Sequence, residues 1–124
     1  MKLRVRGNSL RLRLGQGEVR RLVEEGFVED RTEFGPRTPA FVYVLRVSDG
    51  TGIAATFEGG RITVSVPRAV ARQWAAGGQV GLEGSQPAGG EPLRILIEKD
   101  FECLDAAPGE SQDDAFPNPR GARC

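Results

Sequence analysis

Two stretches of this 124-residue chain carry the same succession of structural signals, displaced by 52 residues. Residues 2–48 and residues 54–100 each show strand-like alternation, a tight turn, a helical segment and two further strand-like runs in the same order. The matched features are the turns Gly7-Asn8 and Gly59-Gly60, the apolar residues Leu10, Leu12, Leu14 and Ile62, Val64, Val66, the glycines Gly26 and Gly78, and the apolar runs 41–45 and 93–97. This correspondence predicts two similar halves, so each half serves as a control for the other.

Each half is expected to form a ββαββ unit. In the first half, residues 2–6 and 9–14 alternate basic with apolar side chains, and Gly7-Asn8 can supply the positive φ angles of a two-residue hairpin loop. Helical spacing of Val19, Leu22 and Val23 predicts a short helix that ends at Gly26. The predicted strands are 2–6, 9–14, 28–34, 41–47, 53–57, 61–66, 79–83 and 92–99, and the predicted helices are 17–25 and 68–76.

The predicted fold class is α+β, with about eight mostly antiparallel strands, two short helices and a pseudo-two-fold axis. Only four aligned positions are identical (Gly7/Gly59, Arg20/Arg72, Gly26/Gly78 and Val28/Val80), so the pattern and not identity supports an internal duplication. The alternative is that two similar supersecondary units simply follow one another. We expect a single domain over residues 1–105, because one hairpin alone is marginally stable, and an irregular or disordered acidic tail over residues 106–124.

Composition excludes several classes of function. The 17 Lys and Arg residues balance the 17 Asp and Glu residues, so no global field attracts nucleic acid or a membrane surface. Aromatic residues make up 6% of the chain and none interleaves with basic residues, so a nucleic-acid partner is not expected. No apolar run has the ~20 residues of a membrane span and no leader pattern is seen, so we expect a soluble cytoplasmic protein.

Residues that carry common chemistry are missing from the sequence. The chain has no histidine, no nucleophile motif and no phosphate-binding glycine loop. We therefore expect no cofactor, and we favour a binding protein over an enzyme. Cys103 and Cys124 match no zinc-binding spacing, so no metal is expected. Cys103 is predicted to be a buried small hydrophobic residue and Cys124 a free thiol, although a disulfide between them remains geometrically open.

The first predicted hairpin places positive charges opposite one another. A two-residue loop at Gly7-Asn8 makes Arg4 face Arg11 and Lys2 face Arg13, and like charges directly opposite are destabilising. In the second half the same positions hold Thr56 opposite Thr63, and Ala54 opposite Ser65, while Glu58 faces Arg61. The candidate anion-binding residues are therefore Lys2, Arg4, Arg6, Arg11 and Arg13.

Three sources of negative charge can compensate this cluster. The first is internal pairing, with Glu29 and Glu33 on the next strand or with Glu110, Asp113 and Asp114 in the tail. The second is solvent alone, because salt screens exposed charges over ~8–10 Å. The third is an external anion, such as a phosphate, a carboxylate or the acidic surface of a partner protein, which arginine binds in a bidentate manner.

The opening KLRVRGNSLRLRL and the later segment EKDFECLD resemble a family of small uncharacterised bacterial proteins that is known as a domain of unknown function. The resemblance extends over most of the chain, through FVED-TEFG at residues 27–35 and PNP at residues 117–119. It implies no activity, substrate or cofactor. It does imply that the basic hairpin and the segment around Cys103 are features of the family.

These observations lead to one function hypothesis and two alternatives. We expect a cytoplasmic binding or interaction module that presents its basic hairpin to an anionic small molecule, an acidic protein surface or its own tail. The first alternative is a small enzyme that holds a phosphorylated or carboxylated molecule with the arginine cluster and uses an Asp or Glu as base. The second is an oligomer that stacks edge strands. The sequence leaves the oligomeric state and the choice between open sheets and a closed barrel undecided.

Overall fold

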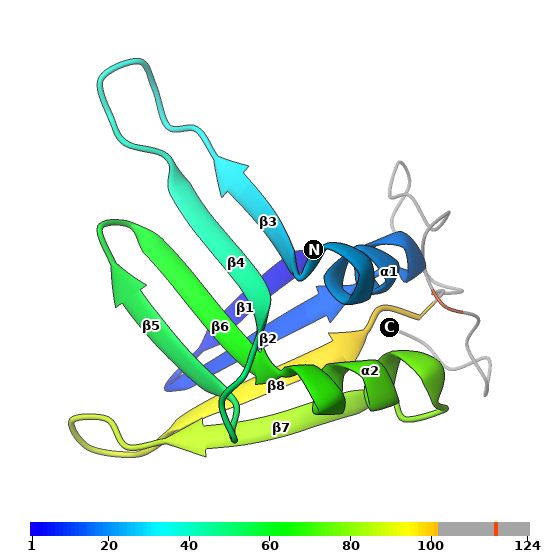
Figure 1. Ribbon diagram of the computed structural model, residues 1–124. Helices are drawn as coiled ribbons and strands as arrows, with labels where there is room; N and C mark the ends of the chain where they lie inside the picture. Colours follow the sequence, from blue (N-terminus) through cyan, green and yellow to red (C-terminus); the bar gives the residue numbers. More distant parts are fainter. Residues whose placement is uncertain (102–115, 117–124) are drawn as a thin grey trace.

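The computed structural model describes residues 1–101 and Phe116, and it contains eight strands and two helices (Figure 1). The order of elements is ββαββ followed by ββαββ, as the sequence predicts. The elements are β1 (Lys2–Arg6), β2 (Ser9–Leu14), α1 (Gln16–Glu25), β3 (Phe27–Thr32), β4 (Phe41–Ser48), β5 (Ala54–Glu58), β6 (Arg61–Pro67), α2 (Arg68–Ala76), β7 (Gly81–Gln86) and β8 (Leu93–Lys99).

The strands form two four-stranded sheets, and each sheet takes one hairpin from each half of the chain. The strand order is β1-β2-β8-β7 in the first sheet and β3-β4-β6-β5 in the second. The hairpins are antiparallel, whereas the central pairs β2–β8 and β4–β6 are parallel. The predicted α+β class is therefore confirmed, with two mixed sheets.

The 52-residue correspondence is present in the strand register. Ser9 pairs with Arg94 in the first sheet, and the positions displaced by 52 residues, Arg61 and Val42, pair in the second. The β1–β2 hairpin and the β5–β6 hairpin match in the same way. The two halves thus exchange hairpins around a pseudo-two-fold axis, an arrangement that fits an internal duplication.

The last hairpin departs from the 52-residue spacing. Val28 pairs with Leu45 in β3–β4, and the equivalent Ile97 of β8 pairs with Leu82 and not with Val80. The β7 strand begins two residues later than the 52-residue spacing predicts, and a loop shorter by two residues between β7 and β8 restores the spacing. The alignment of Val80 with Val28, and the predicted strand at 79–83, were therefore wrong by two residues.

The basic hairpin has the predicted two-residue loop, but only Gly7 has a positive φ, of 52°. Asn8 is instead held against the β7–β8 hairpin. Its side-chain amide donates to the Glu91 carbonyl at 2.8 Å, and its own carbonyl accepts from the Arg94 backbone N–H at 3.0 Å. The tip of the basic hairpin is thereby fixed to the second half of the chain.

The core lies between the two sheets and the helices. Figure 1 shows α1 and α2 side by side at one end of the sheets, with the hairpin loops projecting at the other end. Leu12, Leu22 and Trp74 are almost fully buried, and the Trp74 indole N–H donates to the Val80 carbonyl at 3.1 Å. Among the described residues, neither helix has the length and apolar character needed to cross a bilayer.

Burial of alternate residues in β2 decides which way the basic hairpin faces. Leu10, Leu12 and Leu14 point into the core, so Arg11 and Arg13 point to the outer face of the first sheet.

The sheets approach one another closely where β5 meets β7. A Cβ atom on Gly84 would lie 2.8 Å from Cβ of Ile53, so this contact requires glycine. Beside it, the Gln86 side chain accepts from the Ala55 backbone N–H and donates to the Ala55 carbonyl, both at 2.8 Å. The amide thus satisfies the free edge of β5 in the way that a neighbouring strand would.

Substitution Gly84→Ala is expected to lower the free energy of unfolding by about 1–3 kcal/mol, because the new methyl group overpacks Ile53. Substitution Gly90→Ala is the control, since nothing lies within 4 Å of its Cβ position, and it should change stability by less than ~0.5 kcal/mol. Urea unfolding of both variants tests this. Equal effects of the two substitutions would contradict the close approach of the sheets.

Candidate anion-binding site

The predicted register of the basic hairpin is confirmed. Arg4 lies opposite Arg11, Lys2 lies opposite Arg13, and Arg6 lies opposite Ser9. The cations occupy the outer face of the first sheet, away from the core. We call the outward side chains of β1 and β2 the basic face; its members are Lys2, Arg4, Arg6, Arg11 and Arg13.

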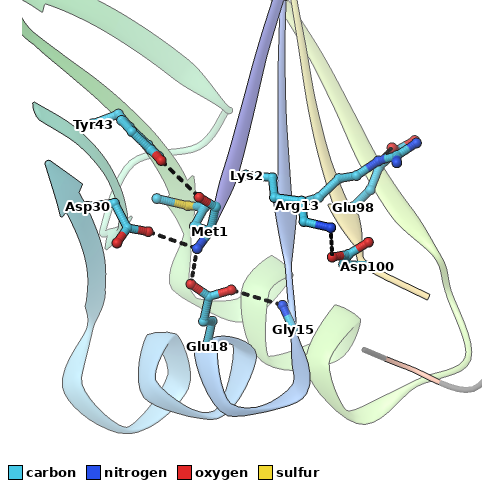
Figure 2. Close-up of polar contacts among 9 residues, drawn as sticks. All are labelled: Met1, Lys2, Arg13, Gly15, Glu18, Asp30, Tyr43, Glu98 and Asp100. Atoms are coloured by element: carbon cyan, nitrogen blue, oxygen red, sulfur yellow. Dashed lines mark hydrogen bonds and ion pairs between the residues drawn. The ribbon is translucent and has the colours of Figure 1, made fainter. Parts of the chain in front are cut away.

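Internal counter-ions reach the basic face from β8, which the sequence analysis did not predict. Lys2 Nζ lies 3.0 Å from Asp100 Oδ2, while Arg11 Nε and Arg13 Nε lie 3.3 and 3.5 Å from Glu98 Oε1 (Lys2, Arg13 and both carboxylates are shown in Figure 2). A single carboxylate is thus shared by two arginines. These pairs exist because β2 runs parallel to β8, so that the end of β8 lies beside the start of β1.

Glu29 and Glu33 do not compensate the basic face, so that expectation was wrong. Glu29 pairs with Arg61 at 3.0 Å, and Glu33 pairs with Arg31 at 3.1 Å, both on the second sheet. The strand β3 that follows α1 belongs to the other sheet, which separates its carboxylates from β1 and β2. The tail residues Glu110, Asp113 and Asp114, as well as Cys103 and Cys124, lie outside the described residues.

Arg4 and Arg6 border a small hollow towards the turn end of the hairpin, beside Gly7-Asn8. Its volume is about 80 Å³, and it is lined by Arg4, Arg6, Ser9, Arg11 and Leu96. Within the part of the chain that the structure describes, no carboxylate pairs with Arg4 or Arg6. Guanidinium groups stay charged at all ordinary pH values, so the hollow is a permanently positive site.

The equivalent face of the second sheet is close to neutral. Thr56 lies opposite Thr63 where the basic face has Arg4 opposite Arg11. Glu58 lies opposite Arg61, whose guanidinium also binds Glu29 from β3. The same fold therefore does not require cations at these positions.

The start of β1 is held by a polar network around the α-amino group of Met1 (Figure 2). The ammonium donates to the Glu18 carboxylate and, at 2.8 Å, to Asp30 Oδ2. The other Glu18 oxygen accepts from the Gly15 backbone N–H at 3.0 Å, and the Tyr43 hydroxyl donates to the Met1 carbonyl at 3.0 Å. This network joins the basic strand to α1 and to the second sheet.

The corresponding corner of the second half is apolar. The positions equivalent to Met1, Glu18, Asp30 and Tyr43 are Ile53, Val70, Gly84 and Ile95. Only the corner that contains the charged amino group has acidic residues.

Two pKa values in the polar network are shifted upward. Burial lowers the pKa of the Met1 amine, but hydrogen bonds and charge from Asp30 and Glu18 outweigh it, so the pKa lies above its ordinary value of 8.0. Burial, together with the negative charges of Asp30 and Glu18, raises the pKa of Tyr43 above 10.0. The amine contribution to stability is therefore full below about pH 8 and is lost as pH rises through the folded-state pKa. The raised pKa of Tyr43 makes ionisation of its hydroxyl destabilising, and this effect begins only above about pH 10.

Lys99 is a buried cation that the sequence analysis did not single out. Its Nζ donates to the Gly77 carbonyl at 2.8 Å and lies 5.8 Å from the Trp74 ring centroid and 5.3 Å from that of Phe116. Burial lowers the pKa of this amine. Lys99 faces the core side of β8, opposite to Glu98, so it takes no part in the basic face.

Substitution Asp30→Asn is expected to cost about 1 kcal/mol of unfolding free energy near pH 7, a value reduced for the partial exposure of Asp30. The loss should shrink as pH rises through the raised pKa of the Met1 amine, because the deprotonated wild-type amine no longer needs the carboxylate. Urea unfolding across this range measures it. Asp49→Asn, at a carboxylate that is 95% exposed, is the control and should show no such pH dependence.

Substitution Arg4→Thr is expected to raise the free energy of unfolding by about 0.2–1 kcal/mol at low salt, because it removes a like-charged cross-strand pair. The gain should fall at high salt, where repulsion is screened. Arg46→Thr is the matched control on the second sheet, since Arg46 lies opposite Phe27 and Ser65. Chemical unfolding at two salt concentrations distinguishes the variants, and an unchanged or lower stability of the Arg4 variant would contradict the repulsion.

Comparison with known proteins identifies the family to which the chain belongs. No match was found among curated proteins or among solved structures. Among the described residues there is also no group of three or more Cys, Asp or Glu side chains arranged to hold a metal ion. The predicted resemblance to a domain of unknown function is confirmed, since such a family matches residues 1–120. The chain therefore belongs to the family of unknown function DUF7009.

Proposed function

We propose that this protein is a cytoplasmic binding module that holds an anionic ligand, or the acidic surface of a partner protein, on its basic face. The observation that carries this proposal is the hollow bordered by Arg4 and Arg6, two arginines that have no counter-ion among the described residues. The neutral face of the second sheet supports the proposal, because the same strand arrangement forms there without cations at the equivalent positions.

The distribution of charges on the basic face supports an external anion. Among the described residues, two carboxylates, Glu98 and Asp100, lie beside Lys2, Arg11 and Arg13, and neither of them pairs with Arg4 or Arg6. Crowded like charges cost stability, and residues that lower stability without a structural role are typical of binding sites.

Protection of a sheet edge does not account for the whole cluster. Cations on an edge strand such as β1 prevent unwanted strand pairing. Arg11 and Arg13, however, lie on β2, which already has a partner on each side. Edge protection therefore explains at most the three cations on β1 and leaves Arg11 and Arg13 unexplained.

The enzyme alternative gains no support from the hollow. A reaction on a bound anion would need an acid or base beside it, and among the described residues the lining consists of arginines, a serine and a leucine. The Ser9 hydroxyl donates to the Arg6 carbonyl at 2.6 Å, and Glu98 is engaged by Arg11 and Arg13. We therefore assign no catalytic residue.

The proposal is tested with the double variant Arg4→Glu/Arg6→Glu and with inorganic phosphate and a hexaglutamate peptide as probes. Wild-type protein should bind at least one probe saturably, and the double variant should bind it at least about tenfold more weakly, because charge-assisted hydrogen bonds are lost. Isothermal titration calorimetry measures both affinities.

The control is Arg31→Glu/Arg46→Glu, which makes the same charge change on the outer face of the second sheet. It should retain wild-type affinity. A binding role for the basic face would be refuted if wild-type protein bound neither probe. Equal losses of affinity in the two double variants would also refute it.

A further inference from the structure

We infer that the hollow recognises a phosphoryl dianion, carried by a phosphate monoester or free as inorganic phosphate; this inference rests on the proposed function and specifies its ligand. The hollow lies where Arg4, Arg6 and Arg11 converge from β1 and β2. Three properties of the site favour a phosphoryl group over a carboxylate: its charge, its size and the donors that remain available.

The charge of the site matches a dianion. Glu98 and Asp100 neutralise the end of the basic face near Lys2 and Arg13, so the excess positive charge is concentrated around Arg4 and Arg6. A phosphate monoester carries about −1.5 to −2 near pH 7, whereas one carboxylate carries −1. A single carboxylate would leave most of this excess charge unbalanced.

The size of the hollow suits a small tetrahedral group. Its volume of about 80 Å³ is equal to the share of two to three waters in the liquid, at ~30 Å³ each. A phosphoryl group fits this space, but the molecule that carries it does not. The carrier would therefore lie outside, and recognition would depend on the phosphoryl group.

The guanidinium donors of the site can bind several oxygens of one ligand at once. Arg4 and Arg6 have no ion pair among the described residues, so their complete guanidinium forks are available. Arg11 uses Nε for Glu98, which leaves its terminal amino groups. Three guanidinium groups with available N–H donors match the three terminal oxygens of a phosphoryl group better than the two oxygens of a carboxylate.

The remaining lining residues support binding without reaction. Leu96 forms an apolar side of the hollow, which limits competition from water. The Ser9 hydroxyl proton is used by the Arg6 carbonyl, and this bond holds together the two strands that contribute the arginines.

Three matched peptides test the inference by isothermal titration calorimetry near pH 7.5. One carries a single phosphoserine, one carries glutamate at the same position, and one carries serine. The phosphopeptide should bind at least about tenfold more tightly than either of the others, because only it supplies a dianion with three terminal oxygens. Inorganic phosphate is titrated as a separate arm to identify the source of the phosphoryl group.

The pH dependence provides a second readout. Between about pH 7.5 and pH 5 the phosphopeptide should lose roughly tenfold in affinity, because its second pKa is near 6 and the dianion becomes a minor species. Sulfate has the same tetrahedral shape and keeps its charge over this range, so its affinity should not fall.

Two acidic groups also lie around the hollow. Glu98 contacts Arg11, and Glu83 pairs with Arg94 on the neighbouring strands at 2.8 Å. Because sulfate keeps its charge, the sulfate titration separates the charge change of the ligand from any contribution of these protein groups.

Substitution Arg6→Gln should weaken phosphopeptide binding at least about tenfold, while Arg46→Gln on the second sheet should leave it unchanged. If phosphate binds as tightly as the phosphopeptide, the ligand is the free anion, and a tighter phosphopeptide assigns the phosphoryl group to a carrier; both results support the inference. Glutamate peptide binding as tightly as phosphopeptide would overturn it and leave the proposed function intact. Absence of binding to all probes would overturn both.

Discussion

The parallel pairing of β2 with β8 is the constraint on which the rest of the structure depends. It joins Ser9 to Arg94, far apart in the chain, and its counterpart β4–β6 does the same in the second sheet. These two ladders interleave the halves, so neither half has a core of its own. The β2–β8 ladder also brings Glu98 and Asp100 to one end of the basic hairpin, and no carboxylate of residues 1–101 pairs with Arg4 or Arg6 towards the other end.

The two halves share one backbone arrangement, but their outward side chains differ in charge and polarity. Inward positions keep the same character in both halves, as Leu12 and Val64 illustrate, because both must fill one close-packed core. Outward positions and corners carry no such restriction. The pair Arg4–Arg11 is therefore replaced by Thr56–Thr63, and the polar corner at Met1 by the apolar corner at Ile53.

Much of the fold could be predicted from local patterns. Alternation and helical spacing locate every strand and helix within a few residues, and a two-residue loop is sufficient to predict the pairing of Arg4 with Arg11. The five residues of the basic face were likewise predicted to share one surface. Errors arose where the signal was weak, as at β7, where consecutive glycines separate helix from strand and the true register lies two residues further on.

What the sequence by itself determined is thus the set of elements, the register of the first hairpin and the side of it on which the cations lie. These properties depend on neighbouring residues and on the two-residue period of a strand. The partner of β2 was decided only by the tertiary structure, because pairing between distant strands is selected by how two apolar faces close over a shared core. For that reason only the tertiary structure identifies Glu98 and Asp100 as the counter-ions and places Glu29 and Glu33 on the second sheet. The hollow at Arg4 and Arg6 likewise depends on the tertiary structure.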